Sequence, residues 1–313
     1  VRIDGAAATT EQLRTIGGIS IDFARDTADI SDRQNVQLHW IRVEDMPEIW
    51  RRLEAVGLIT TEACGDCPRV VLGSPVAGIA ADEIIDPTPV IDQIVERFIG
   101  DPDISNLPRK FKSAITGHPS LDVVHEINDI SLVGVVHPEL GPGYDLWVGG
   151  GLSVAPRLAE RLGVFVTADQ AAEVWHGVVR IFRDYGYRRL RNRARLKFLV
   201  ADWGPEKFRE VLETEYLGYV NYDDEARRSV SLRRPIVDLR SDFLSHATPA
   251  MDAWALGVMA YQLFMGQLPF PQQAWSSLGW GCFRWSWRVA YSCLCRGMAY
   301  RSSWERTSSF ASS

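Results

Sequence analysis

Cysteine is scarce in the 313-residue chain: five are present, unevenly placed along it. A distribution of this kind provides no disulfide framework, so we expect a reducing, cytoplasmic compartment. The sequence also shows no signal-peptide pattern. The one apolar stretch of membrane-like length, residues 253–270, lies at the lower length limit for a span and is interrupted by Gln262, Gly266 and Gln267. We therefore expect no membrane segment.

An excess of positive charge is likewise absent. The net charge is −6 at pH 7, which argues against a nucleic-acid partner, so any basic cluster must be local. With 46% hydrophobic and 24% charged residues, the composition is that of an ordinary globular protein. The length has room for two domains and a sizeable core.

Residues 33–43 alternate in the manner of a β-strand. Val36, Leu38 and Trp40 point to one side, which predicts a core-facing surface. The other side carries four hydrogen-bonding side chains and no carboxylate: Arg33, Asn35, Gln37 and His39. Two interpretations fit this face, a contact with a large anionic ligand and a solvent-exposed edge strand, and the spacing alone favours neither.

The first part of the chain alternates between helix and strand patterns. Thr9 or Thr10 caps a predicted helix, and Asp45 caps a second one that ends at Gly57. A further strand is predicted at residues 70–72. This alternation is typical of an α+β fold of the α/β-sandwich type.

A second unit begins near residue 86. Helical spacing starts at Val90, and a following strand places Lys110 and Lys112 on one side and Phe111 on the other. Further strands are predicted at residues 130–136, 144–148 and 196–200, and helices at 168–185 and 205–216. Beyond about residue 217 the character of the sequence changes. Residues 251–270 resemble one segment of a protein-kinase C-lobe, without the motifs of phosphoryl transfer, so we expect an irregular tail.

Several motifs occur in a fixed order along the chain. They are Phe23–Ile30, the Arg-Gln-Asn-x-Gln-x-His run from Arg33, Cys64–Arg69, Gly73–Gly78, Leu107–Lys112 and Trp147–Gly151. In this order they resemble the sirohaem-dependent nitrite and sulfite reductases, specifically the ferredoxin-dependent kind of actinobacteria. The resemblance extends from about Arg2 to about Tyr216. It implies a ferredoxin-like half-domain at 1–78, a sirohaem and iron–sulfur α/β domain at 79–240, and an unrelated tail at 241–313.

The resemblance also implies a function. We expect an assimilatory sulfite reductase that takes electrons from ferredoxin, carries out the six-electron reduction of sulfite to sulfide, and works as a monomer. A first alternative is a ferredoxin-dependent nitrite reductase that produces ammonia. A second, of another class, is a non-catalytic or chimeric product without cofactors. The presence or absence of sirohaem colour separates this last alternative from the enzymes.

The family's anion-binding residues correspond to Arg69, Lys110 and Lys112, which would bind sulfite or nitrite and supply protons. Ordinary surface lysines are the plainer interpretation of Lys110 and Lys112. The residues expected to contact sirohaem, whose carboxylates need cationic and amide donors, are Arg33, Asn35, Gln37, His39, Cys64, Arg109, Arg195 and Lys197. Arg193 belongs to the same predicted basic strand as Arg195 and Lys197, and a basic surface patch is the alternative there.

The Cys64-x-x-Cys67 pair admits two further interpretations, a thioredoxin-like redox pair and half of a zinc site. Pro68 follows the second cysteine instead of lying between the two, and no second pair occurs nearby. Gly149–Gly151 lack the spacing of a dinucleotide fingerprint. We expect these glycines to let the backbone approach the macrocycle.

The family's four-iron four-sulfur cluster is bound by Cys-x5-Cys and Cys-x3-Cys pairs in the C-terminal half. Cys282, Cys293 and Cys295 match neither spacing, so we expect the cluster ligands to be absent from this chain. A fourth basic residue of the anion site belongs just upstream of Val1 in the family pattern. Together these features predict a fragment of a longer reductase.

Overall fold

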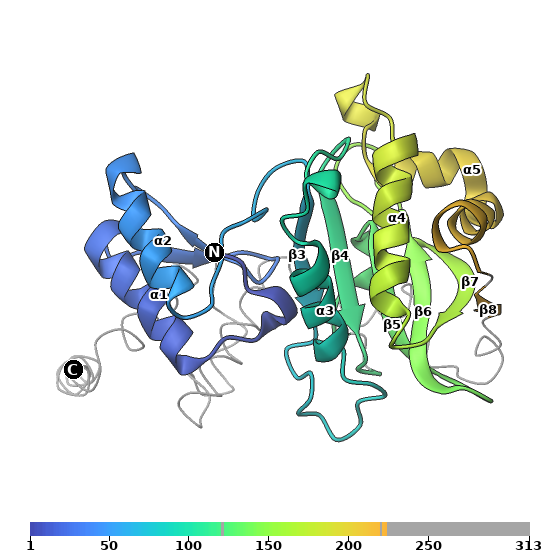
Figure 1. Ribbon diagram of the computed structural model, residues 1–313, viewed down its shortest axis with the longest axis horizontal. Coiled ribbons are helices and arrows are strands. Elements are labelled where there is room, and N and C mark those ends of the chain that lie inside the picture. The colour runs from blue at the N-terminus through green and yellow to red at the C-terminus, as the bar shows by residue number, and fades with distance from the viewer. Residues whose placement is uncertain (120–121, 220, 224–313) are drawn as a thin grey trace, which may run out of the picture.

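The computed structural model describes residues 1–119, 122–219 and 221–223. The tail expected from residue 241, with its kinase-like segment and its three cysteines, lies outside the described residues. No helix in the described part is long and apolar enough to cross a membrane. The predicted α+β fold is confirmed: two helices pack on a small two-stranded sheet, and a larger helix-covered sheet follows (Figure 1).

The N-terminal unit begins with the short 3-10 helix η1 (Asp4–Ala6) and is built on two helices, α1 (Thr10–Phe23) and α2 (Met46–Glu54), with η2 (Val43–Asp45) before the second. A capping box starts α1, since Thr9 accepts from the Gln12 amide and the Gln12 side chain accepts from Thr9. Strands β1 (Ala28–Ile30) and β2 (Val36–Leu38) pair antiparallel. Ile16, Ile19, Val36, Ile49 and Leu53 form the buried core of this unit.

The second unit holds a six-stranded sheet in the order β3-β4-β5-β6-β7-β8. The strands are β3 (Pro68–Gly73), β4 (Phe111–Thr116), β5 (Ile130–His137), β6 (Gly141–Val148), β7 (Glu160–Val166) and β8 (Tyr222–Asp223). The first three run parallel to one another, and the remaining pairs are antiparallel. The boundary expected at residue 78 falls after β3, although β3 pairs with β4 in this sheet.

Helices α3 (Thr88–Phe98) and α4 (Ala171–Tyr185) lie side by side over one face of the sheet (Figure 1). Trp175 of α4 is fully buried there, packs edge-on against Phe111, and donates from Nε1 to Ser113 Oγ at 2.8 Å. The remaining elements are η3 (Pro102–Ile104), η4 (His125–Ile127), η5 (Arg191–Arg193), α5 (Leu196–Val211) and the π-helical turn η6 (Leu212–Leu217). The main core therefore lies between the sheet and α3, α4 and α5.

The strand expected at residues 196–200 is wrong, because these residues form the first turns of α5. Leu196, Leu199 and Val200 are buried together in the main core, and their spacing is that of one helix face. Gly204 then adopts a non-helical conformation inside α5. Short apolar runs do not distinguish strand from helix by periodicity alone.

The strand expected over residues 33–43 is reduced to Val36–Leu38. Gln34 and Trp40 adopt positive φ values of 63° and 66°, which end the extended conformation on either side. Trp40 is consequently 63% exposed, with the Arg25 guanidinium over its ring, and is not a core residue. The predicted alternation does not continue through the whole run.

Candidate functional site

Five cationic side chains come together where the parallel strands of the large sheet begin. Lys110 precedes β4, Lys112 lies in it, Arg69 is the second residue of β3, and Arg195 immediately precedes α5. Arg33 reaches the same place from the N-terminal unit. We call Arg33, Arg69, Lys110, Lys112 and Arg195 the cation cluster.

Asp129 is a carboxylate whose charge acts on Arg33, Lys110 and Lys112, and its side chain is fully buried. The carboxylate of Asp32 also acts on Arg33. Asp129 accepts from Arg195 Nη2 at 2.8 Å and Nε at 3.3 Å, and from the Lys112 backbone amide at 2.8 Å. The first two bonds form a fork that fixes the Arg195 guanidinium. Asp129 was not among the residues selected from the sequence; its position directly before an apolar strand is the only local signal it carries.

Arg33 is a partly buried member of the cluster with an unused donor. Its Nη1 donates to Asn128 Oδ1 at 2.9 Å, and its Nη2 donates to the carbonyls of Val70 at 2.9 Å and Ser113 at 3.1 Å. Its Nε is buried without a hydrogen-bond partner among the described residues. Burial lowers the pKa of Arg33 to about 10, against the opposing influence of Asp129. A buried donor left open in this way is suited to an anionic ligand.

Lys110 and Lys112 lie on the face opposite Phe111, as the alternation of the sequence predicts. Burial, followed by the charges of Arg33, Arg195 and Lys110, lowers the pKa of Lys112 to about 8. Burial and neighbouring arginines also lower the pKa of Lys110. Neither ammonium group forms a hydrogen bond or ion pair with another described residue. Both lysines therefore hold available positive charge at neutral pH.

The turn that contains Cys64 borders the cluster. Arg69 donates from Nε to the Gly65 carbonyl at 3.0 Å and from Nη1 to the Ala63 carbonyl at 3.2 Å. Cys64 is exposed and Cys67 is buried, and the two are not joined as a disulfide. Burial, and then Glu62, raise the pKa of Cys67 to about 11, so its thiol is protonated at neutral pH. A thioredoxin-like pair needs a stabilised thiolate, and Cys67 does not provide one.

Asp66 in the same turn is shared by two arginines. Arg191 donates to the Asp66 carboxylate from Nη1 at 2.8 Å and from Nη2 at 3.3 Å, and Arg109 Nη1 lies 3.8 Å from it. Arg109 thus lies at the border of the cation cluster, and its charge contributes to the lowered pKa of Lys110. Its expected contact with sirohaem stays a prediction.

No hydrogen bond or ion pair among residues 1–119, 122–219 and 221–223 joins Asn35, Gln37 or His39 to the cation cluster. Asn35 Oδ1 accepts from the Ile3 amide at 3.2 Å, and His39 pairs with Asp29 at 2.9 Å in an exposed position. Gln37 is exposed in β2. The structure brings Arg33 into the cluster without these three, so their roles in cofactor binding remain expectations.

Lys197 is separated from the cluster by its own hydrogen bonds. Its ammonium group is buried and lies 2.8–3.2 Å from four carbonyl oxygens, those of Gly151, Leu152, Val154 and Ala155. An ammonium group has three hydrogens, so none is left for a carboxylate of sirohaem. These contacts do not support the cofactor role expected for Lys197; they support the 151–155 loop.

Two of the three glycines expected at the macrocycle, Gly149 and Gly150, pack tightly against neighbouring protein. A Cβ at Gly149 would meet Val200 at 2.8 Å, and one at Gly150 would meet the Glu126 carbonyl oxygen at 2.2 Å. The glycine run therefore allows β6 to lie close to α5 and to the turn before β5. Close packing alone accounts for a glycine at 149 and at 150, and the approach of this backbone to the macrocycle stays a prediction.

The donor set fits sirohaem, a macrocycle that carries carboxylates. Five cations surround one buried carboxylate, and the free Arg33 Nε and two free ammonium groups lie among them. No set of three or more His, Cys, Asp and Glu side chains within the described ranges could hold a metal ion. The described residues thus fit the anionic macrocycle and offer no ligand set for an iron–sulfur cluster.

Comparisons with known proteins identify the family of the chain. Residues 1–56 match the nitrite/sulfite reductase ferredoxin-like half domain, and residues 64–219 match the nitrite and sulphite reductase 4Fe-4S domain. A sulfite reductase (ferredoxin) of Mycobacterium tuberculosis is 66% identical over 217 residues, which cover 69% of this chain and 39% of that protein. An assimilatory ferredoxin-dependent nitrite reductase of Haloferax mediterranei is 41% identical over 223 residues, covering 66% of this chain and 38% of that protein.

A solved structure, that of the NirA protein of Mycobacterium tuberculosis, superimposes with a TM-score of 0.70 at 65% identity. The match covers 71% of this chain and 40% of that structure, so the chain spans about two fifths of the length of its relatives. Through residues 1–56 and 64–219, the chain belongs to the nitrite and sulfite reductase family.

Proposed function

We propose that this chain is the sirohaem- and anion-binding part of a ferredoxin-dependent assimilatory sulfite reductase, which carries out the six-electron reduction of sulfite to sulfide. The observation that carries the proposal is the cation cluster, in which the buried Nε of Arg33 and two lysines keep donors free beside the buried carboxylate of Asp129. A cytoplasmic location and a monomeric state belong to the same proposal.

The residues of the cluster divide into two roles. Arg33 and Arg195, held by Asn128 and Asp129, are placed to bind the carboxylates of sirohaem. Arg69, Lys110 and Lys112 are placed to bind the oxygens of the substrate anion and to stabilise negative charge. When bound, sirohaem supplies the redox-active iron through which electrons reach the anion.

Lys112 is suited to supply protons as oxygens leave the anion as water. With a pKa of about 8, its ammonium group is mostly protonated at neutral pH and gives up a proton more readily than an ordinary lysine. Burial is the main cause of this shift. Lys110 stands next to it and is a second source of protons.

Sulfite is the preferred substrate in this proposal because the relatives at 64–66% identity are named sulfite reductases. The nitrite reductases are more distant, at 41% for the haloarchaeal protein. Nitrite is the second candidate substrate, since both are small anions that the same three cations can bind. The family's iron–sulfur cluster and the ferredoxin donor belong to the proposed whole enzyme.

The test is to produce the chain together with the enzymes of sirohaem synthesis and to record its visible spectrum, with iron and labile-sulfide assays on the same sample. Sirohaem bands without labile sulfide are the expected result. Arg33→Leu should lose the bands, and Arg51→Leu, which changes an exposed arginine paired with Glu48, should keep them. A colourless but folded protein would overturn the proposal and favour a non-catalytic product. Spectral titration with sulfite and with nitrite then compares the two substrates.

A further inference from the structure

The strand that carries Arg69 contains a bulge at that residue. Pro68 of β3 pairs with Phe111 of β4, but the next pair is Val71 with Ser113. Two residues of β3, Arg69 and Val70, thus stand opposite the single residue Lys112. An inserted residue bends a strand and changes the direction of a side chain, and bulges of this kind are uncommon between parallel strands.

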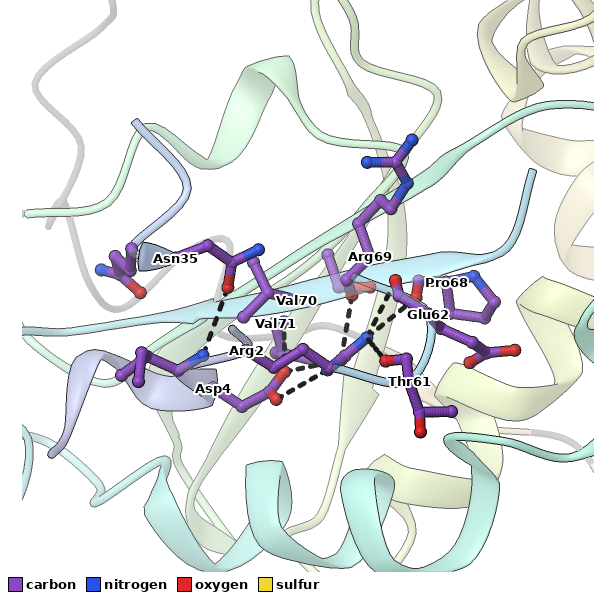
Figure 2. A network of polar contacts seen from close by, with 12 residues as sticks. Arg2, Asp4, Asn35, Thr61, Glu62, Pro68, Arg69, Val70 and Val71 are labelled. Atoms are coloured by element: carbon purple, nitrogen blue, oxygen red, sulfur yellow. Dashed lines mark hydrogen bonds and ion pairs between the residues drawn. The ribbon is translucent and has the colours of Figure 1, made fainter. Parts of the chain in front are cut away.

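The bulge brings Arg69 to the face of the cation cluster. Val71 belongs to the main core on the helix-covered face, and strict alternation from Val71 would place Arg69 on that face as well. Instead the Arg69 guanidinium binds the Cys64 turn, and its charge lowers the pKa of Lys110 and of Arg33. Figure 2 shows its side chain directed away from Arg2, across the strand.

The backbone of the bulge is held by side chains from the start of the chain, because β3 is the outer strand of the sheet. Arg2 is buried and donates to the carbonyls of Pro68 at 3.2 Å and Arg69 at 3.5 Å (Figure 2). Asp4 accepts from the Val71 amide at 2.8 Å. Asp4 in turn holds the Arg2 guanidinium through two bonds, of 3.0 and 2.8 Å.

The same guanidinium extends to the turn before the strand. Arg2 Nη1 donates to the carbonyls of Thr61 at 3.5 Å and Glu62 at 3.3 Å, while Arg33 binds the remaining carbonyl of the bulge, that of Val70. Three backbone groups at the bulge, the carbonyls of Arg69 and Val70 and the amide of Val71, thereby pair with charged side chains. A bulge satisfied in this way has one defined geometry.

We propose that Arg2 and Asp4 are positioning residues for anion binding: they lock the bulge of β3 in the geometry that directs Arg69 into the cation cluster. The proposal rests on the proposed function, in which Arg69 binds the substrate anion. In this proposal neither residue binds the anion: Arg2 acts through the Arg69 carbonyl, and Asp4 acts through the Val71 amide and the Arg2 guanidinium.

The test uses the full chain and four variants: Asp4→Asn, Arg2→Lys, Arg69→Met and the double variant Asp4→Asn/Arg69→Met. Asp4→Asn keeps an acceptor for the Val71 amide and removes the charge that orients Arg2. Asp22→Asn is the matched control, because Asp22 pairs with Arg52 at a distance from the sheet. Circular dichroism establishes that each variant is folded.

The first readout is the binding of sulfite, measured by calorimetry. Arg69→Met should weaken binding roughly tenfold or more, as expected for the loss of a charged hydrogen-bond donor. Asp4→Asn should weaken it by a similar factor and Arg2→Lys by less, while Asp22→Asn leaves it unchanged. The double variant should bind sulfite no more weakly than Arg69→Met, because Asp4 affects binding only through the Arg69 guanidinium, which this variant lacks. Additive losses would overturn the proposal.

The second readout does not depend on the anion. The chain has four lysines, so NMR of labelled lysine side chains resolves the titration of Lys110. Burial is the main cause of its lowered pKa, with Arg195, Arg69 and Arg109 adding to it. If Asp4→Asn releases Arg69, the pKa of Lys110 should rise, as it should in Arg69→Met. An unchanged titration in Asp4→Asn, beside a changed one in Arg69→Met, would overturn the positioning role. Unchanged sulfite binding in Arg69→Met would instead overturn the anion-binding function.

Discussion

Asp129→Asn tests whether the cation cluster depends on its buried carboxylate. The side chain of Asp129 is fully buried, that of Arg195 is 12% exposed, and two bonds of 2.8 and 3.3 Å join them. An asparagine at this position keeps one acceptor for the Lys112 amide. The group that it presents to Arg195 is an uncharged amide. Removing one partner of a buried ion pair leaves the other charge uncompensated, which costs about 3–5 kcal/mol.

This cost is large enough to measure in the full chain. A domain of this size loses roughly 2–4 °C in Tm per kcal/mol, so Asp129→Asn should lower Tm by about 6–20 °C. Urea unfolding followed by circular dichroism gives the same quantity as a free energy. A loss below about 1 kcal/mol would refute the reasoning, because it would mean that Arg195 is not desolvated in the folded protein.

Asp66→Asn is the matched control, since Asp66 also receives two bonds from an arginine. Its partner Arg191 is 65% exposed, and the pair should contribute about 0–1 kcal/mol. The double variant Asp129→Asn/Arg195→Leu should recover part of the stability lost in Asp129→Asn, because it removes the uncompensated charge. Asp129→Asn should also lower the pKa of Lys112 further below about 8, since the carboxylate supports its charged form.

Three further results are expected. Affinity for sulfate should fall as the pH rises through about 8, where Lys112 loses its proton, and in Lys112→Arg this decrease should disappear from calorimetric titrations between pH 6 and 9. Gly73→Ala should destabilise the chain by about 1–3 kcal/mol, because the added Cβ would meet Gly5 Cα at 2.6 Å. Gly18→Ala should stabilise it by about 0.5–1 kcal/mol, because Gly18 lies inside α1 and a Cβ there would meet no atom within 4 Å. Urea unfolding measures both free energies. Lys197→Met should leave four carbonyls of the 151–155 loop without their donor, so limited proteolysis should cleave there faster than in the wild type; an unchanged rate would contradict the role of this ammonium group.

Features with regular local geometry were predictable from the sequence. The helix after Thr9 follows from its capping box, and the opposite orientation of Phe111 and the two neighbouring lysines follows from an uninterrupted strand. These patterns depend on residues within a few positions of one another. Nothing distant in the chain overrides them, so the pattern and the structure agree.

Irregular backbone explains most of the differences. Positive φ at Gln34 and Trp40 is rare for such residues and leaves no mark in the hydrophobic pattern, so the Arg33 run was expected to extend as one strand. The apolar run 196–200 fits strand and helix equally well in isolation, and packing against α4 and β7 decides for the helix. Strand β7 was absent from the prediction.

Contacts between distant residues explain the rest of the site. Asp129 is placed among the cations by the register of three strands, and Arg69 is turned toward them by a bulge. Neither relation can be read from spacing along the chain. The sequence identifies which residue types gather here, and the fold decides which of them meet.

The arrangement of side chains along the outer edge of β3 has a consequence for dividing the protein. Three side chains pair with backbone groups of β3 that a strand from another molecule could otherwise bind. Arg2 and Asp4 bind the start of β3, and Gln34 bonds both the amide and the carbonyl of Gly73. An uncovered edge strand is a template for intermolecular pairing. Expressing the sheet unit without the first 34 residues would expose this edge, and we expect that shorter product to form insoluble aggregates.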